Sequence, residues 1–516
     1  KLIQLYSLRS QKAGFAFSKD DFLSQSFEQD FGYELTPDQK KALQEIKEDM
    51  EKPIIMDRLL CGDVGFGKTE VAFRAIFKAI NSGKQVALLC PTTLLARQHY
   101  LTAVERFKNY GVRIALLSRM VPEKEQQSIL KRLKEKEIDL IIGTHRLLSN
   151  DVVFADLGFL VVDEEHKFGV EHKEKIKELK ANIDVLTLSA TPIPRTLQMS
   201  LSGIRSLSTI ETPPNNRYPV QTYVVSYNKK LIKDAIYKEL SRNGQVFLLY
   251  NRIDSMNSKL EEVKQLVPDA KIVCANGRMN KTELEDIMLK FINHEFDVLL
   301  CTTIIETGID IPNANTLIVI DADKFGLSQL YQLRGRVGRT NKIAYCYLMY
   351  DNSRILSEIA HKRLNAIKEF TELGSGLSIA RRDLSLRGAG DFLGSEQAGF
   401  VDSVGIELFT QMLKQEIDKL KGIEVNEEVD TQPLIEVDTY IDDNYVKEEE
   451  LKIEIHKKIN EIDSYDKLLS VQKELEDRFG KISDKLLIYM YEEWFEALAN
   501  KLKIKRVKQT NNTVEI

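Results

Sequence analysis

No stretch of this sequence reaches the roughly eighteen consecutive apolar residues that a membrane-spanning helix needs. The first residues, KLIQLYSLRSQKAGFAF, lack the apolar core and the small-residue cleavage site of a signal peptide. The chain also lacks an initiator methionine, so we expect it to be a fragment of a longer protein. A membrane-spanning protein is not expected.

Cysteine is scarce, and its spacing predicts neither a disulfide framework nor a metal site. No CxxC pair occurs, and most of the cysteines lie in apolar runs, which predicts reduced core thiols in a cytoplasmic protein. His145, His166 and His172 are not accompanied by cysteines or by a recognised metal spacing, so a zinc site is not expected. The five cysteines are Cys61, Cys90, Cys274, Cys301 and Cys346.

An excess of positive charge is missing as well. The 516 residues carry 73 Lys and Arg against 78 Asp and Glu, which gives a net charge of −5 and a pI of about 6.0. This balance does not by itself predict nucleic-acid binding, although a local basic groove decides binding more than the total charge does. The apolar (43%) and charged (29%) fractions are those of a globular protein. A chain of this length predicts roughly three or four domains.

Short apolar runs alternate with helical stretches along most of the chain. QVALLCPT, IDLIIGTH, LGFLVVDEEH and VLTLSAT predict buried strands, and segments such as LLARQHYLTAVERFKNY between them have the apolar spacing of helices. A Pro/Asn-rich linker, ETPPNNRYPV, interrupts this pattern, which then resumes with GQVFLLYN, AKIVCANG, FDVLLCTT and NTLIVIDAD. The pattern predicts the α/β class, with two tandem lobes that each hold a parallel sheet covered by helices.

The remaining segments predict smaller modules around these lobes. Helix with a glycine-rich break, RGAGDFLG, follows the second lobe, and an acidic stretch, VNEEVDTQP, precedes a small α+β C-terminal domain. That domain closes with VKQTNNTVEI, which resembles a hairpin, and we expect it to be truncated. The expected domains are a helical N-terminal linker (1–30), lobe 1 (31–212), lobe 2 (213–350), a helical hairpin (351–422), an acidic linker (423–437) and the C-terminal domain (438–516).

GDVGFGKT, between a predicted strand and a predicted helix, fits the P-loop pattern GxxxxGK[ST]. Backbone N–H groups of such a loop, together with the N-terminus of the next helix, wrap a triphosphate. We expect Lys68 to bind the β- and γ-phosphates of ATP and the Thr69 hydroxyl to hold Mg²⁺. A chance glycine-rich turn is the alternative, which the strand–loop–helix setting disfavours. The residues expected to bind ATP here are Gly62, Asp63, Val64, Gly65, Phe66, Gly67, Lys68 and Thr69.

FLVVDEEH ends another predicted strand with carboxylates. We expect Asp163 to complete the Mg²⁺ coordination and Glu164 to activate the attacking water. Such a pair alone is more often a solvated turn, but the P-loop earlier in the chain favours the catalytic interpretation.

FGYELTPDQ places an amide and two aromatic rings just before a predicted helix. An amide pairs bidentately with adenine and a ring stacks on it, so Gln39 and Phe31 are expected at the base of ATP. The alternative is that Phe31 and Tyr33 are simply core residues.

QLRGRVGR combines three arginines with two glycines in the second lobe. The first lobe supplies no obvious arginine to the γ-phosphate, where an arginine arriving from outside is worth ~10³–10⁵ in rate. We therefore expect Arg336 and Arg339 to reach the γ-phosphate across a cleft that ATP closes and hydrolysis opens. Surface salt bridges, the alternative, explain neither the glycine spacing nor the second lobe.

In their order, these motifs resemble those of superfamily 2 helicase-type motors: TPDQ, GDVGFGKTE, PTTLLARQH, IGTHRLL, DEEH, SATPIPRT, CTTIIETGIDIP and QLRGRVGR. The resemblance covers about residues 31 to 400 and implies that the two lobes are RecA-like. The resemblance implies that the coupling of ATP hydrolysis to lobe movement involves Ser189, Thr191 and Gln332. It also implies a motif that faces both nucleotide and nucleic acid, formed by Glu306, Gly308 and Asp310.

Two families within this superfamily are similar: the transcription-repair coupling factors and the RecG-type fork helicases. FGLSQLYQLRGRVGR followed by RGAGDFLG occurs in both. Phe66, the DEEH box, IIETGIDIP and the C-terminal domain look like the coupling factors. RecG-type chains have a serine at the position of Phe66, the box DEQH, a VGVDVP ending and an upstream wedge domain.

The resemblance to the coupling factors implies an ATP-dependent double-stranded DNA translocase that pushes a stalled RNA polymerase forward and helps to recruit nucleotide excision repair. The loop near Arg387 is implied to convert lobe closure into motion on the duplex. Its alternative is a helical cap in which Gly388 and Gly390 merely turn the chain. Most of that family's polymerase-interaction domain and its repair-protein-like region are absent here, so we expect polymerase and repair proteins to bind through regions largely missing from this sequence.

Contacts with DNA are expected at the strand ends of both lobes. The backbone amides and hydroxyls of PTT, GTH and TT lie where a phosphate backbone could run, which positions DNA without reading its sequence. Binding is therefore expected to be independent of sequence and to weaken with salt. The expected DNA-binding residues are Pro91, Thr92, Thr93, Gly143, Thr144, His145, Thr302 and Thr303.

Three functions remain open from the sequence. They are a duplex DNA motor that couples transcription to repair, a strand-separating RecG-type fork helicase, and a partner-binding adaptor whose ATP site switches with little turnover. Intact Lys68, Glu164 and Arg339 argue against the adaptor, although the C-terminal domain leaves room for a docking surface. The charge run KEEELKIEIHKK favours a solvated helix face over a partner site.

Overall fold

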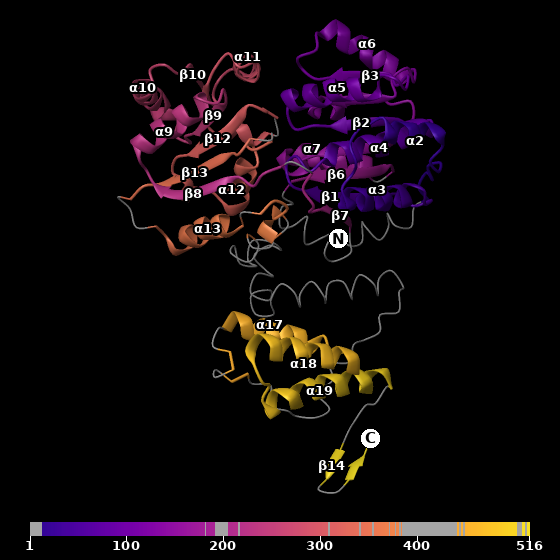
Figure 1. Ribbon diagram of the computed structural model, residues 1–516. Coiled ribbons are helices and arrows are strands. Elements are labelled where there is room, and N and C mark those ends of the chain that lie inside the picture. The colour runs from indigo at the N-terminus through magenta and orange to yellow at the C-terminus, as the bar shows by residue number, and fades with distance from the viewer. Residues whose placement is uncertain are drawn as a thin grey trace. The chain divides into compact units, whose positions relative to one another are not determined.

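The computed structural model divides the chain into two compact units, residues 1–423 and 424–516, and the first unit contains two α/β lobes (Figure 1). No helix in the part of the chain that the structure describes is long and apolar enough to cross a membrane. The described residues are 13–180, 182–190, 205–214, 217–307, 310–339, 342–352, 356–370, 372–376, 378–380, 383, 441–442, 445–446, 449–502, 508–510 and 513–515.

The first lobe is built on a seven-stranded, wholly parallel sheet with the order β3-β4-β2-β5-β6-β1-β7. Residues along each strand alternate between the two faces, and both faces are apolar: Val86 and Leu88 of β2 join one core cluster, whereas Ala87 and Leu89 join another. The strands are β1 (Asp57–Gly62), β2 (Gln85–Leu89), β3 (Ile114–Leu117), β4 (Leu140–Gly143), β5 (Leu157–Asp163), β6 (Asp184–Ser189) and β7 (Ser206–Ile210).

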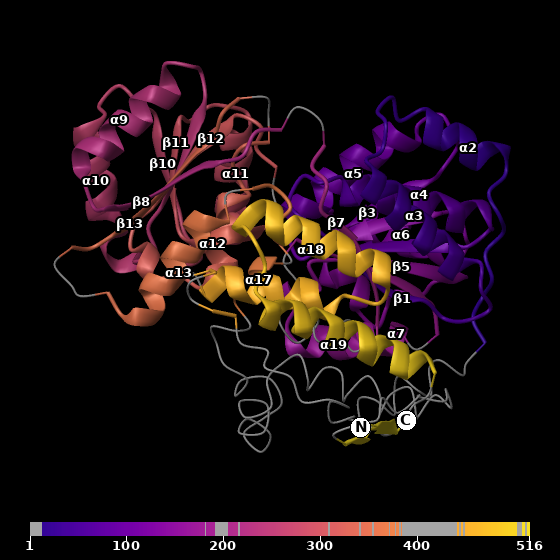
Figure 2. The ribbon, with the colours of Figure 1, turned by 60° about the horizontal axis from the view of Figure 1, so that its bottom comes forward.

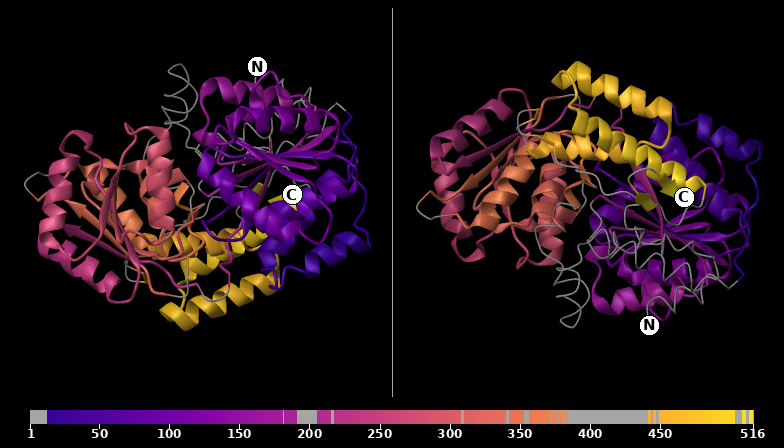
Figure 3. Two further views of the ribbon diagram at one scale, coloured as in Figure 1. Left: turned by 90° about the horizontal axis from the view of Figure 1, so that it is seen from above. Right: turned by 90° about the horizontal axis from the view of Figure 1, so that it is seen from below.

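Helices cover both faces of this sheet, as the view from above shows (Figure 3). One face packs against α2 (Phe22–Gln29), α3 (Pro37–Met50), α4 (Lys68–Asn81) and α5 (Thr93–Phe107). The other packs against α6 (Glu123–Lys134) and α7 (Val170–Lys180). The parallel three-layer lobe predicted from the sequence is confirmed.

Residues 13–30, the described part of the predicted N-terminal linker, pack on the first lobe. Phe17 and Phe27 are buried in the first-lobe core, with exposed fractions of 3% and 0%. The Phe27 ring stacks on Phe77 at 4.3 Å and on Phe107 at 4.9 Å. Burying an aromatic ring of this size stabilises the lobe by roughly 1.5–3 kcal/mol. The predicted linker therefore contributes an aromatic anchor that its sequence did not reveal.

The second lobe holds a six-stranded parallel sheet with the order β10-β11-β9-β12-β13-β8. Helices α9 and α10 pack on one face, and α11, α12 and α13 on the other (Figure 2). The strands are β8 (Gln221–Ser226), β9 (Gln245–Leu249), β10 (Ile272–Ala275), β11 (Val298–Cys301), β12 (Ala314–Val319) and β13 (Tyr345–Tyr350). The helices are α9 (Lys229–Leu240), α10 (Met256–Leu266), α11 (Lys281–Ile292), α12 (Leu327–Arg334) and α13 (Glu358–Glu369).

The C-terminal unit is mostly helical and has its own core. Helices α17 (Glu449–Asn460), α18 (Tyr465–Phe479) and α19 (Asp484–Lys501) pack around Ile459, Leu468 and Met490. Strands β14 (Lys508–Thr510) and β15 (Thr513–Glu515) pair antiparallel, which confirms the hairpin predicted for VKQTNNTVEI. The glycine-rich segment with Arg387, Gly388 and Gly390 lies outside the described residues.

All five cysteines are free thiols, and only Cys274 is not fully buried. Burial raises the pKa of Cys61 and of Cys346 to about 12, so both remain protonated at neutral pH. The prediction that most cysteines lie in the core is confirmed, and their reduced state stays a prediction.

Candidate active site

Three neighbouring strands of the first sheet end at one edge and carry the predicted catalytic motifs. The P-loop follows β1, Ser189 ends β6 and Asp163 ends β5, and these strands are adjacent in the sheet. Because the carboxyl ends of parallel strands meet at the same edge, motifs far apart in sequence face one site.

Within the P-loop, Lys68 begins helix α4 and its side chain folds back over the loop. Gly65 and Gly67 have φ angles of 80° and 77°, a region that favours glycine. Lys68 Nζ donates to the carbonyl oxygens of Gly62 (2.5 Å) and Asp63 (2.9 Å). Desolvation lowers the pKa of Lys68, and the carboxylates around it oppose that effect. The ammonium is thus held at the mouth of the loop by two carbonyl groups.

Glu164 is held in a defined position by the end of the neighbouring strand. Its backbone has a φ of 47°, a left-handed conformation that is strained for a residue with a side chain. Its carboxylate accepts hydrogen bonds from the Ala190 backbone N (3.1 Å) and from Ser189 Oγ (3.3 Å). Burial and the Asp163 carboxylate raise the pKa of Glu164, against the opposing effect of Lys68 and of other nearby cations. A carboxylate with a raised pKa is a stronger proton acceptor.

Two histidines flank the acidic pair. His99 Nε2 lies 2.9 Å from Asp163 Oδ2, and His166 Nδ1 lies 3.2 Å from Glu164 Oε2. Desolvation, aided by nearby lysines, lowers the pKa of His166 to about 4. His166 is therefore a neutral imidazole at neutral pH and adds no charge beside Glu164.

The oxygen donors predicted for Mg²⁺ lie at the same edge of the sheet. Thr69 is the second residue of α4, and Asp163 is the last residue of β5. Mg²⁺ in nucleotide sites is held by one or two protein oxygens together with phosphates and waters. The described part of the chain holds no group of three His, Cys, Asp or Glu that could bind a metal. A hydroxyl and one carboxylate fit a magnesium ion that arrives with the triphosphate.

At the predicted adenine end, Gln39 is engaged by the protein. Its Nε2 donates to the Phe66 carbonyl oxygen at 2.8 Å, and its Oε1 accepts from the Thr36 backbone N at 2.9 Å. Pairing with adenine would require the amide to exchange these bonds. Phe31 packs on the first-lobe core and meets Tyr33 edge to face, with 5.5 Å between ring centroids. Phe31 therefore packs as the core alternative expects, whereas Tyr33 is 78% exposed and is not a core residue.

The second lobe brings one of the two predicted arginines, Arg336, close to the first lobe. Arg336 is 5% exposed and lies close enough to Glu164 to oppose the rise in its pKa. Arg339 Nη1 instead lies 2.8 Å from Asp310 Oδ1, within its own lobe. The glycine spacing has a physical reason, because a Cβ at Gly335 would lie 3.2 Å from the Val64 side chain of the P-loop. Gln332 is buried in the same segment, whereas Thr191 and Gly308 lie outside the described residues.

Three residues that the sequence did not single out also contact the P-loop. The Tyr331 hydroxyl and the Gly374 backbone N (2.8 Å) both donate to Asp63 Oδ2. Arg217 donates to the Val64 carbonyl oxygen and, at 3.3 Å, to the Gly338 carbonyl oxygen. Arg217 belongs to the Pro/Asn-rich linker, where nothing in the local pattern marks it.

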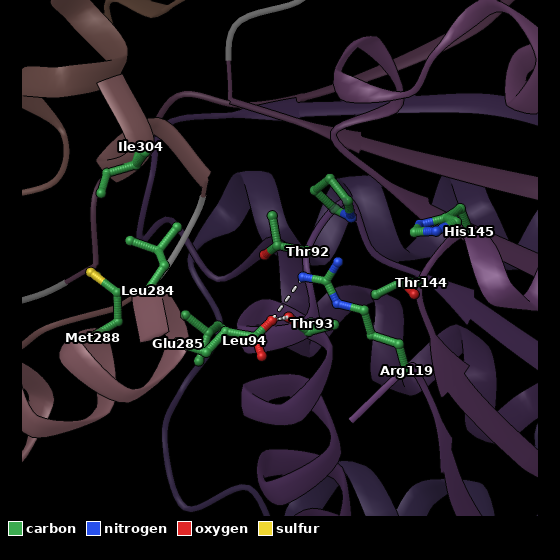
Figure 4. Close-up of a pocket in the computed structure, with 11 residues that line it drawn as sticks. Thr92, Thr93, Leu94, Arg119, Thr144, His145, Leu284, Glu285, Met288 and Ile304 are labelled. Carbon is green, nitrogen blue, oxygen red and sulfur yellow. Dashed lines mark hydrogen bonds and ion pairs between the residues drawn. The ribbon is translucent and has the colours of Figure 1, made fainter. Parts of the chain in front are cut away.

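The predicted DNA-binding residues of the first lobe meet the second lobe at a cavity of about 260 Å³ (Figure 4). Thr92 caps α5 by accepting from the Leu95 backbone N at 3.3 Å, and Gly143 ends β4. Thr302 and Thr303 follow β11 and immediately precede Ile304, which lines the cavity. The lining residues are Pro91, Thr92, Thr93, Leu94, Arg119, Thr144 and His145 from the first lobe, and Leu284, Glu285, Met288 and Ile304 from the second.

Three family models match the chain: DEAD/DEAH box helicase over residues 36–200, Helicase conserved C-terminal domain over residues 228–341, and TRCF domain over residues 435–516. A transcription-repair-coupling factor of Bacillus subtilis (strain 168) is 54% identical to the chain over all of its 516 residues. Over its whole length the chain is similar to the transcription-repair-coupling factors. A second family member, from Staphylococcus epidermidis, is 55% identical over 93% of the chain. The chain spans 44% and 41% of the length of these two relatives.

Two solved structures resemble a large part of the chain. RecG bound to a three-way DNA junction is 34% identical, with a TM-score of 0.65, over 80% of this chain and 56% of that chain. The helicase Lhr of Mycobacterium smegmatis has a TM-score of 0.52 over 68% of this chain and 50% of that chain, and at 18% identity it shows the fold alone. The TRCF domain and the identity to coupling factors favour that family over RecG. The predicted class, an ATP-hydrolysing superfamily 2 motor of the translocase or helicase type, is confirmed.

Proposed function

We propose that this chain is an ATP-driven motor that moves along double-stranded DNA without sequence preference. The observation that carries the proposal is a double contact with the P-loop, where Tyr331 of the second lobe and Gly374 of the segment after α13 both donate to Asp63. A nucleotide site built from two lobes makes the lobe arrangement depend on the nucleotide, and such a two-state change can drive stepping.

ATP binds at the carboxyl edge of the first sheet. The backbone N–H groups of the P-loop and the N-terminus of α4 hold the phosphates, and Lys68 exchanges its two carbonyl partners for the β- and γ-phosphates. Mg²⁺ at Thr69 and Asp163 would neutralise phosphate charge and orient the triphosphate. Gln39 holds the P-loop through the Phe66 carbonyl, and the base of ATP lies beside it.

Hydrolysis uses groups from both lobes. Glu164, whose raised pKa suits a general base, takes a proton from the attacking water while Ser189 and Ala190 hold its carboxylate. Arg336 and Arg339 stabilise the charge that spreads over the γ-phosphate oxygens. Arg339 must first leave its ion pair with Asp310, so its arrival marks closure of the cleft.

We extend the function of the named relatives to this chain as part of the proposal. The motor acts on a stalled RNA polymerase and couples transcription to nucleotide excision repair, together with protein segments that the chain does not span. A RecG-type fork helicase is the second candidate, and the 34% identity to RecG on a three-way junction favours it. An adaptor with little turnover is opposed by the placement of Glu164 and Arg336. The cytoplasmic location expected from the cysteines stays a prediction.

Displacement of a labelled third strand from a triplex tests the function. We expect ATP-dependent displacement, no unwinding of a forked duplex, and loss of displacement in Arg339→Ala. Fork unwinding would establish the RecG-type candidate instead. ATP turnover at saturating DNA without either activity would contradict a motor and support the adaptor.

A further inference from the structure

Glu285 links the two lobes at the predicted DNA-binding face. It lies on α11 of the second lobe and is 7% exposed. Its carboxylate accepts hydrogen bonds from Thr93 Oγ1 and, at 3.1 Å, from Arg119 Nη2, both in the first lobe. Figure 4 shows Thr93 and Arg119 reaching this carboxylate from the opposite wall of the cavity.

The two groups that donate to Glu285 are of the kind that also bind a phosphodiester. A phosphodiester and a carboxylate each carry one negative charge shared by two terminal oxygens. A guanidinium and a threonine hydroxyl are common donors to DNA phosphates. Thr93 belongs to the segment expected to run along the DNA backbone, and Arg119 follows β3 at the same edge of the sheet. The Arg119 side chain remains 42% exposed, so it is accessible from outside the contact.

A second observation at the cavity also indicates a ligand. The Thr144 side chain is buried, at 2% exposure, and lines the same cavity. Within the described part of the chain its Oγ1 has no hydrogen-bond partner. A buried hydroxyl without a partner is unfavourable, so a polar ligand with acceptor oxygens would relieve that cost.

We propose that Thr93 and Arg119 form a binding site for a DNA phosphodiester, and that Glu285 occupies this site as a phosphate mimic when DNA is absent. DNA and Glu285 then compete for the same two donors. DNA binding to the first lobe releases α11 and loosens the second lobe, which also covers the P-loop through Tyr331. This inference rests on the proposed function, because it requires the chain to bind duplex DNA.

Two single variants, each of which removes one charge, and their double variant test the competition. The affinity of each variant for a labelled DNA duplex is measured over a range of salt concentrations. Glu285→Gln keeps the side-chain shape but loses the charge, so we expect about fivefold tighter binding or more. Arg119→Gln should weaken binding and reduce the slope of log affinity against log salt by about 1. In the double variant the gain from Glu285→Gln should be largely lost, because Arg119 is the donor for which the two acceptors compete.

Matched controls remove the same charges elsewhere. Glu283→Gln changes an exposed residue on the same helix, and Arg132→Gln an exposed residue of the first lobe, so neither should reproduce these effects. Equal affinities of the Glu285→Gln and Glu283→Gln variants would overturn the inference, as would a full gain in the double variant. Melting temperatures of all variants show whether each is folded. If the unmodified chain fails to bind duplex DNA, the proposed function itself fails, which is a different result from a missing Glu285 effect.

Discussion

The hydroxyl of Tyr331, in the second lobe, donates to the carboxylate of Asp63, in the P-loop of the first lobe. The two residues are 268 positions apart, and the Gly374 backbone N shares the same carboxylate oxygen. Burial and the Asp63 carboxylate raise the pKa of Tyr331, so the phenol stays protonated and remains a donor at any physiological pH. The P-loop is therefore hydrogen-bonded to the lobe that has to move during ATP turnover.

Replacing Tyr331 by phenylalanine removes the hydrogen bond to Asp63 and changes little else. The buried Asp63 carboxylate would then keep only the backbone donor, at a cost of about 1–3 kcal/mol in the free energy of unfolding. We expect a lower melting temperature by calorimetry without added nucleotide. Tyr345→Phe, in β13 away from the P-loop, is the control. Equal melting temperatures of both variants would contradict a stabilising role for the Tyr331–Asp63 bond.

Replacing Glu164 by glutamine should separate ATP binding from hydrolysis. The amide keeps the shape but accepts no proton, so we expect kcat to fall by about 10²–10⁴ while a non-hydrolysable ATP analogue still binds. Single-turnover hydrolysis and equilibrium binding measure the two effects. Loss of binding in proportion to the rate would argue for a structural role.

The pH dependence of ATP hydrolysis also tests whether Glu164 accepts the proton. Because the pKa of Glu164 is raised, the carboxylate takes up its proton at a higher pH than an ordinary glutamate, whose pKa is about 4.3. We expect kcat/KM to rise with pH through this raised pKa and to level off above it. His166→Gln should keep this acid limb, since the His166 pKa is only about 4. If the acid limb disappeared in His166→Gln, the group that titrates in this limb would be His166 instead of Glu164.

Replacing Arg339 by alanine should slow hydrolysis without preventing ATP binding. Arg339 is paired with Asp310 in this structure and is expected to leave it for the γ-phosphate, so its loss should lower kcat by about 10³. Arg252→Ala breaks a half-exposed ion pair with Asp321 in the same lobe and serves as the control. An unchanged kcat in Arg339→Ala would leave Arg336 as the arginine that acts on the γ-phosphate.

Arg217 should matter more for movement than for hydrolysis. Its guanidinium bridges the Val64 and Gly338 carbonyl oxygens, so it connects the interlobe linker with the P-loop and the arginine-rich segment. We expect Arg217→Gln to reduce triplex displacement per ATP hydrolysed by up to about 10²-fold, because a misplacement of about 1 Å can have effects of this size. Arg278→Gln, exposed in the second lobe, is the control. Equal losses of hydrolysis and displacement would show that Arg217 acts on chemistry alone.

Much of the candidate site could be predicted from local patterns. The P-loop, the box at Asp163 and the motif at Ser189 each follow an apolar strand, and the parallel-sheet rule brings strand ends together. The segment QLRGRVGR predicted a contact across the cleft between the lobes, and Gly335 of this segment does lie against Val64. Such signals work because a strand, a turn and a helix start are encoded within a few residues.

Other features have no local signature. The aromatic anchor Phe27 looked like part of a linker, because its partners Phe77 and Phe107 lie in two later helices. Glu285 looked like one of many charges on an amphipathic helix, and only its burial against Thr93 and Arg119 distinguishes it.

The sequence by itself determined the two parallel-sheet lobes, the nucleotide motifs at their strand ends and the family that the chain resembles. The tertiary structure alone decided which residues join the lobes: Arg217 on Val64, Tyr331 on Asp63 and Glu285 on Thr93, across 153, 268 and 192 positions of the chain. The physical reason is that periodicity and turn chemistry act over a few residues. A contact between lobes, in contrast, depends on how two separately folded surfaces meet.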